Sequence, residues 1–176
     1  MEILEWINNN ILQNNRADKL EGNDIQNVLA FTLLWNLYED LFWTRNKENT
    51  NSSAYSLGKA LGTIEIKKDK FNEDNINPIF CYFYEKYQDT NKFESLKFRK
   101  QGKDAEVKVK LTIMLNSMIE HNKGDKLYFI MAIVFRFRNN LFHGEKQLIS
   151  IQYQEENFKY ANQFLMHIIE KSKEDL

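Results

Sequence analysis

Proline and glycine are rare in this chain, since its 176 residues include one proline and six glycines. The turns between β-strands depend heavily on these two residues, because glycine adopts left-handed backbone angles and proline presets a turn. A chain with so few of them favours long helices over an all-β fold. The sequence therefore predicts an all-α protein, an up-and-down bundle of five to six helices in one domain over residues 1–176.

Composition limits the class of protein further. A hydrophobic fraction of 43% over this length is enough for a substantial core. The formal net charge of −1 gives no global attraction to nucleic acid, so any such binding must come from a local patch. The single cysteine, Cys81, fits a reducing compartment and is expected to be a buried small hydrophobe. The chain starts without a secretory signal pattern, and its longest apolar run, residues 127–137, is too short to cross a bilayer. We therefore expect a cytoplasmic protein with no membrane partner.

Hydrophobic periodicity divides the chain into helices and one polar stretch. Residues 45–75 are expected to be a polar insertion or loop between the helices of a core that spans residues 24–171. Within it, residues 54–61 could form one or two helical turns, and residues 62–67 a short strand or an extended loop. We expect helices over the following segments: an N-terminal amphipathic helix within residues 1–20, then 25–43, 78–88, 104–119, 126–143 and 153–171.

Three of the expected helices have features that predict their burial or their ends. The helix over residues 25–43 is apolar on nearly all of its circumference, which indicates burial on several sides or by a partner chain. Pro78 fits the first turn of its helix, and Asp104 and Asp125 are suited to cap the next two helices. The helix after Asp104 is expected to turn Met118 and Ile119 inward.

The segment over residues 136–144 combines residue types suited to phosphate chemistry. The planar guanidinium of arginine donates two parallel, charge-assisted hydrogen bonds to a phosphate. Histidine can accept or donate a proton near neutral pH. The segment therefore predicts phosphodiester chemistry without a metal ion or other cofactor. Its candidate residues are Arg136, Arg138, Asn139, Asn140 and His143.

Either arginine could be the partner of His143. On an ideal helix, with roughly 100° per residue, Arg136 shares a face with Asn139, Asn140 and His143, whereas Arg138 lies roughly 140° from His143. A purely structural interpretation also exists, because cations near a helix C-terminus complement its dipole. The two asparagines favour a site, since they are poor residues for a helix interior and indicate a polar cavity.

The residues 138–143 resemble the motif of HEPN (higher eukaryotes and prokaryotes nucleotide-binding) domains, which is an arginine, four to six residues and a histidine. Arg138, followed by the polar Asn139, matches the four-residue spacing to His143, and Arg136 matches the six-residue spacing. The helix over residues 31–43 looks like the first core helix of that family, where an acid such as Glu39 often faces the site. The resemblance covers residues 24–171.

The resemblance implies a homodimer in which two motifs meet across the interface to form a composite active site. It implies a metal-independent endoribonuclease that acts on RNA, of the kind found in toxin–antitoxin and antiphage-defence systems. An antitoxin or another regulatory protein could then be a partner. Some toxin members carry a tyrosine near the histidine that an antitoxin modifies. Here Phe142 precedes and Gly144 follows, so that form of regulation is not expected.

The resemblance also assigns roles to residues. His143 would act as general acid or base on the ribose 2′-hydroxyl or the leaving oxygen. Arg138 would hold the scissile phosphate, and Asn139 would orient the phosphate or the histidine, leaving a 2′,3′-cyclic phosphate as product. The residues expected to bind substrate around them are Arg136, Asn140, Lys146 and Glu39.

Two other functions stay open on the sequence alone. One is a non-catalytic HEPN-like module that binds RNA or a nucleotide, and the other is an all-helical dimerisation or adaptor protein. The basic stretch over residues 92–110, with Phe93 and Phe98, could follow an RNA backbone or could be a solvated surface over two core aromatics. His121 and His167 lack companions at metal-ligand spacing.

Overall fold

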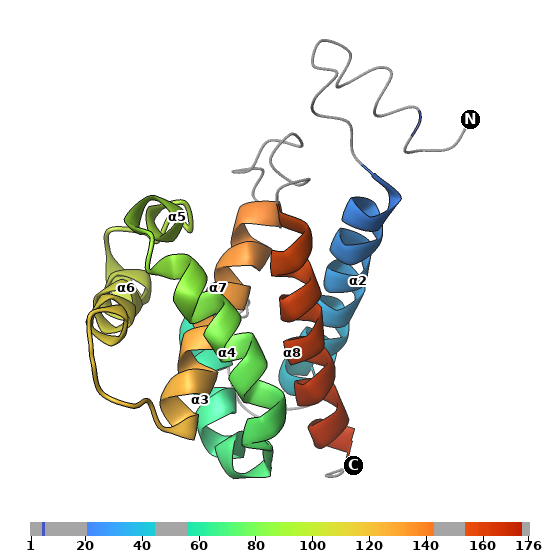
Figure 1. The fold of residues 1–176 in the computed structure, drawn as a ribbon. Helices are drawn as coiled ribbons and strands as arrows, with labels where there is room; N and C mark the ends of the chain where they lie inside the picture. The colour runs from blue at the N-terminus through green and yellow to red at the C-terminus, as the bar shows by residue number, and fades with distance from the viewer. Residues whose placement is uncertain (1–4, 6–20, 45–55, 143–153, 174–176) are drawn as a thin grey trace.

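The computed structural model describes residues 5, 21–44, 56–142 and 154–173, and this part of the chain is an all-α bundle, as predicted (Figure 1). The N-terminal helix expected within residues 1–20 lies outside the described residues, apart from Glu5. The described elements are α2 (Gly22–Glu39), the π-helix η1 (Asp40–Thr44), α3 (Leu57–Lys67), the 3₁₀-helix η2 (Lys68–Lys70), α4 (Glu73–Tyr87), α5 (Thr90–Glu94), α6 (Gly102–Leu115), α7 (Lys123–Phe142) and α8 (Glu155–Lys173).

The central element of the bundle is α7. It packs against α3 and α4, while α8 packs against α2 and α4. Figure 1 shows α5 and α6 on one flank of the molecule and α2 on the opposite flank. Every α7 residue from 129 to 137 is buried. A helix that is apolar on all sides is stable only when other elements surround it, which explains its central position.

Aromatic side chains join the helices of the core. Trp35 of α2 meets Phe135 of α7 edge-on, with ring centroids 5.7 Å apart. Phe83 of α4 meets Phe137 of α7 in the same way at 5.8 Å. Burying one such side chain contributes roughly 1.5–3 kcal/mol, and a favourable ring pair adds about 0.5–1.5 kcal/mol. These contacts fix the rotation of α7 and therefore which of its residues face outward near its C-terminal end.

The prediction of a strand or extended loop at residues 62–67 was wrong, because α3 is one helix from Leu57 to Lys67. The Ser56 side chain caps it by accepting a hydrogen bond from the backbone N–H of Lys59 at 3.4 Å. Leu57, Leu61 and Ile64 are buried at helical spacing, on a helix that packs against α7. Tertiary packing overrides the low helix propensity of the glycine at position 62.

Three helix starts differ from the prediction, because residues other than Pro78, Asp104 and Asp125 begin or cap these helices. Helix α4 begins five residues before Pro78, since Asn72 accepts a hydrogen bond from the backbone N–H of Asp74 at 3.0 Å. Gln101 is the N-cap residue of α6, so Asp104 lies in the first turn instead of capping it. At the start of α7, Asn122 accepts from the backbone N–H of Asp125 at 3.0 Å.

Two predictions of burial were also wrong. Helix α6 ends at Leu115, so Met118 and Ile119 lie beyond it and are exposed. Cys81 is exposed as well, because the phase of α4 turns its neighbour Phe80 toward the core instead. None of the helices in the described residues is long and apolar enough to cross a membrane.

Candidate functional site

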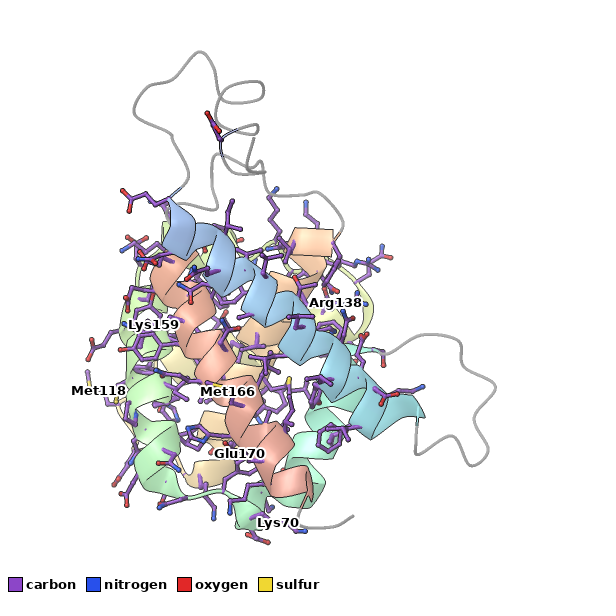
Figure 2. All side chains as sticks on the ribbon, turned by 90° about the vertical axis from the view of Figure 1, so that its right-hand side faces the viewer. Lys70, Met118, Arg138, Lys159, Met166 and Glu170 are labelled. Carbon is purple, nitrogen blue, oxygen red and sulfur yellow. The ribbon has the colours of Figure 1, made fainter. Side chains whose placement is uncertain are left out.

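The last two turns of α7 hold the arginines and asparagines that the sequence singled out. The structure places the two arginines in different surroundings. Arg136 is 2% exposed and forms part of the interior, whereas the side chain of Arg138 is 25% exposed. Figure 2 shows Arg138 beside α2, on the side of the molecule where α2 and α8 face the viewer.

The guanidinium of Arg138 is held between two other polar side chains. Its Nη2 donates to Oε1 of Glu39 at 3.3 Å, and its Nη1 donates to Oδ1 of Asn139 at 3.2 Å. Glu39 is the last residue of α2 and its side chain is 24% exposed. The structure therefore brings together three predicted site residues, Arg138, Asn139 and Glu39.

Arg138 keeps hydrogen-bonding capacity beyond these two contacts. A guanidinium carries five N–H donors, so Nη1 and Nη2 each keep a second N–H, whereas Nε is buried and has no hydrogen-bond partner among the residues that the structure describes. The ring of Phe142, one helical turn further along α7, lies under the guanidinium, with its centroid 5.4 Å from Cζ. That ring is 48% exposed. The site thus presents a cation and an aromatic ring next to each other at the surface.

Arg136 serves a different purpose, which is to hold the chain between α5 and α6. Its Nε donates to the carbonyl oxygen of Leu96 at 3.0 Å, and its Nη1 meets Oδ2 of Asp104 at 2.9 Å. Its Nη2 donates to the carbonyl oxygen of Lys97 and, at 3.1 Å, to Oδ1 of Asn140. The fully buried Asn140 in turn donates to the carbonyl oxygen of Leu96 at 3.2 Å. We call Arg136, Asn140 and Asp104 the clasp.

The clasp changes how the predicted site residues group. The ideal-helix geometry put Arg136 on one face with Asn139 and Asn140, but the structure pairs Arg136 with Asn140 and Arg138 with Asn139. Arg136 and Asn140 were expected to bind substrate, but their side chains have almost no surface exposed to solvent. Of the two arginines, Arg138 is therefore the one that can meet a ligand from solvent.

Two features of this site were not found from the sequence. Directly after Glu39 the backbone changes from an α-helix to the π-helix η1, and such π segments occur frequently at functional sites. Nothing in the residue pattern distinguished this turn from the helix before it. Phe142 was noted only for its position before the histidine, although an exposed aromatic at the end of an apolar helix could have indicated a contact residue.

The remaining candidates lie either outside the described residues or away from Arg138. His143, Gly144 and Lys146 lie outside the described residues. His121 packs edge-on against Phe80, with ring centroids 5.6 Å apart, and Nδ1 of His167 lies 3.9 Å from a carboxylate oxygen of Glu170. Within the described ranges, no group of three or more His, Cys, Asp and Glu side chains is placed to hold a metal ion.

Comparison with known proteins adds no family assignment. The chain matches no protein-family model, no curated protein and no solved structure. The resemblance to HEPN domains therefore stays a prediction from the motif residues.

Proposed function

We propose that this protein is a HEPN-type, metal-independent endoribonuclease whose active site is built on Arg138, Asn139, His143 and Glu39. The observation that carries the proposal is the position of Arg138. Its guanidinium is partly exposed, lies between Asn139 and Glu39, and belongs to the helix that leads to His143. The buried Arg136 lacks that exposure.

Arg138 suits the binding of a scissile phosphate. Glu39 and Asn139 fix the plane of the guanidinium from two sides, which lowers the entropy lost when a phosphate binds. The second N–H groups of Nη1 and Nη2, which these two contacts do not use, can donate to phosphate oxygens. A cation fixed in this way stabilises the negative charge that grows on the phosphate oxygens in the transition state.

His143 would supply the proton transfers. A base removes the proton of the ribose 2′-hydroxyl, and the 2′-oxygen attacks the adjacent phosphorus. The bond from phosphorus to the 5′-oxygen breaks, and that oxygen takes up a proton from an acid. The products are an RNA fragment that ends in a 2′,3′-cyclic phosphate and one that begins with a 5′-hydroxyl. Imidazole suits either transfer, because its pKa lies near neutrality.

In this proposal, the ring of Phe142 contacts the RNA base next to that phosphate. Its half-exposed ring lies under the guanidinium of Arg138. Stacking of a base on an aromatic side chain is worth about 1–3 kcal/mol and is available only to an unpaired base. RNA with a single-stranded stretch is therefore the substrate class that fits this site.

The partner implied by the proposal is a second copy of the chain. Three leucines of α2 form an exposed stripe at four-residue spacing: Leu29 is 57%, Leu33 66% and Leu37 53% exposed. Apolar surface gathered in this way on one helix face is typical of an interaction site. Dimerisation through the leucine stripe would bury the exposed face of α2, which explains why the sequence of this helix is apolar on nearly all of its circumference. In the ribonuclease proposal, an antitoxin or other regulatory protein would restrain the dimer.

The same stripe favours a second candidate function, an all-helical dimerisation or adaptor protein. In that case the Arg138–Glu39 contact would only join two helices. The two candidates differ in what a change at His143 does. Without the imidazole, an adaptor would still dimerise and bind its partner. A ribonuclease would still dimerise but would no longer cleave RNA.

The test uses the full-length protein and a single-stranded RNA labelled at one end, in a buffer with a metal chelator. Wild-type protein is expected to cleave the RNA, and His143→Ala is expected to lower the rate by at least about 100-fold. Circular dichroism verifies that the variant is folded, and sedimentation verifies that it is still a dimer. A His143→Ala protein that cleaves at the wild-type rate would remove His143 from the mechanism.

A further inference from the structure

We propose that residues 97–103, which we call the cationic loop, bind the phosphate backbone of a nucleic-acid strand at a distance from the scissile bond. The loop follows α5 and includes the first residues of α6. That the strand is RNA rests on the proposed function, while the phosphate binding stands on the loop itself. The sequence left two interpretations of residues 92–110 open, and the loop at residues 97–103 favours phosphate binding over a merely solvated surface.

Positive charge is concentrated in the cationic loop. It holds Lys97, Arg99, Lys100 and Lys103 and no acidic residue, in a chain whose net charge is −1. All four cationic residues are exposed. A protein without a global positive field must attract phosphates through a local patch of this kind.

The acidic residues near the cationic loop are engaged with other cations. The carboxylate of Asp104 is bound by Arg136 inside the clasp, at 2.9 Å. Glu94 pairs with Lys108 at 2.8 Å, and Glu106 pairs with Lys103 at 2.9 Å.

Arg99 and Lys100 are left as the cations of the loop that can bind a ligand. No ion pair joins the side chain of either residue to any residue in the described ranges. Together with Gln101 and Gly102 they line a surface hollow of about 490 Å³. A phosphate group in this hollow would meet both cations without breaking an existing ion pair.

The clasp holds the cationic loop in one shape. Lys97 has a φ of 53°, a left-handed conformation that residues with a Cβ rarely adopt, and Arg136 donates to its carbonyl oxygen. The carboxylate of Asp104 also accepts from the backbone N–H of Arg99 at 3.2 Å. A buried arginine thus keeps the loop in a conformation that costs energy. Because the loop already has this conformation, it loses less conformational entropy when a ligand binds, which is the advantage of a preformed site.

The surface of the cationic loop is polar, which favours a phosphate backbone over a lipid surface. Phe98, the one aromatic residue in the loop, packs inward against the guanidinium of Arg136 and the ring of Phe93, at 5.5 and 5.9 Å. Membrane-binding segments insert apolar side chains beside their cations, and the cationic loop has none to insert. Phosphates of a single strand need only the cations.

The position of the cationic loop relative to Arg138 fits one continuous strand. Arg136 and Asn140 hold the loop against one side of the last two turns of α7, and Arg138 leaves the same two turns toward α2. A strand whose scissile phosphate lies at Arg138 would therefore pass the end of α7 to reach the loop. Contacts there would raise affinity without taking part in the cleavage step.

The test measures binding of a fluorescent single-stranded RNA to the full-length His143→Ala protein, so that cleavage does not interfere. Arg99→Ala/Lys100→Ala in this background is compared with the matched control Lys70→Ala/Lys159→Ala. The control also removes two exposed cations, from positions that Figure 2 shows away from Arg138. Each protein is titrated at several salt concentrations, and thermal unfolding verifies the fold.

The loop variant is expected to bind the RNA about 10-fold more weakly, with a salt slope of log affinity that is smaller by roughly 1.4, or 0.7 for each lost phosphate contact. The control variant should bind as the parent does. Equal losses in both variants, or binding of anionic vesicles in place of RNA, would overturn the proposal. Cleavage by the wild type is measured separately. Weaker binding by the loop variant without any wild-type cleavage would contradict the ribonuclease and leave the loop proposal supported.

Discussion

Glu39 and Arg138 lie 99 positions apart in the sequence, yet Nη2 of Arg138 donates to Oε1 of Glu39 at 3.3 Å. The contact joins the C-terminal end of α2 to the last turns of α7. Both side chains are about one-quarter exposed, so the ion pair is expected to add only about 0–1 kcal/mol to stability. Its main effect is to fix the direction of the guanidinium, which is what a phosphate-binding arginine needs.

The two arginines of the motif should differ in what they do for stability. Arg136→Ala would leave the carboxylate of Asp104, which is only 12% exposed, without its cation, and would remove the hydrogen bonds that Arg136 donates to the carbonyl oxygens of Leu96 and Lys97, at a cost of about 3–5 kcal/mol. This corresponds to a fall in melting temperature on the order of 10 °C. Arg138→Ala should cost about 1 kcal/mol or less. Thermal unfolding of both variants by calorimetry checks the difference, and equal losses would contradict the assignment of the clasp.

Glu39 should act on cleavage through Arg138. Glu39→Gln keeps the shape of the side chain but weakens its hold on the guanidinium, so kcat is expected to fall by roughly 10-fold with a smaller change in KM. The matched control is Glu65→Gln on α3, which alters an exposed carboxylate that pairs with Lys68 of η2. Steady-state kinetics on a short RNA separate the two parameters. A rise in KM with kcat unchanged would instead indicate that Glu39 acts in substrate binding.

The leucine stripe should control the oligomeric state. Leu33 is 66% exposed in one chain, so Leu33→Glu costs the folded monomer little, but it would place a charge inside an interface formed by α2. Sedimentation velocity is expected to show a dimer for the wild type and a monomer for the variant. Ile113→Glu, at a position 65% exposed on α6, is the control and should stay dimeric. Both variants remaining dimeric would place the interface elsewhere.

Alkaline pH should destabilise the protein through its buried tyrosines. Burial raises the pKa of Tyr87 well above its ordinary value of 10.0, since the phenolate would be desolvated in the core. In the unfolded chain the same group ionises near pH 10. The stability that depends on the neutral phenol is therefore fully present below about pH 10 and is lost as the pH rises above it.

The measurement for this prediction is urea unfolding at pH 8 and pH 11. The wild type should lose free energy of unfolding between the two, and Tyr87→Phe should lose less, because it has no proton to release at that position. An identical loss in both proteins would show that other groups, such as the half-buried Tyr82, whose pKa burial also raises, control the alkaline limb.

The sequence predicted the helical bundle and the position of the motif, because both depend on local patterns. The apolar run of α7 identifies a central helix whatever surrounds it, and the polar residues that follow mark where it leaves the core. The wrong assignments arose where a few residues decided the outcome. The glycine at position 62 and the weak alternation of apolar and polar residues after it led to the wrong prediction for the second half of α3. Helix α4 begins before Pro78 because Asn72 caps it.

The division of work between Arg136 and Arg138 could not be predicted from the sequence. Helical geometry gives the angle between two residues but not which element covers each face. The partners of Arg136 on other elements lie between residues 96 and 104, some 30 to 40 positions earlier in the chain, and the distant partner of Arg138 is Glu39. Only the packed structure shows that one guanidinium is enclosed and the other is at the surface.

Whether Arg138 holds the scissile phosphate is tested most directly by the rate of RNA cleavage by Arg138→Ala beside the wild type, with the ends of the products identified. The wild type is expected to leave 2′,3′-cyclic phosphate and 5′-hydroxyl ends, and a folded, dimeric Arg138→Ala protein is expected to cleave about 10²–10³-fold more slowly. Cleavage by Arg138→Ala at the wild-type rate, or wild-type products that end in a free 3′-hydroxyl, would contradict this expectation.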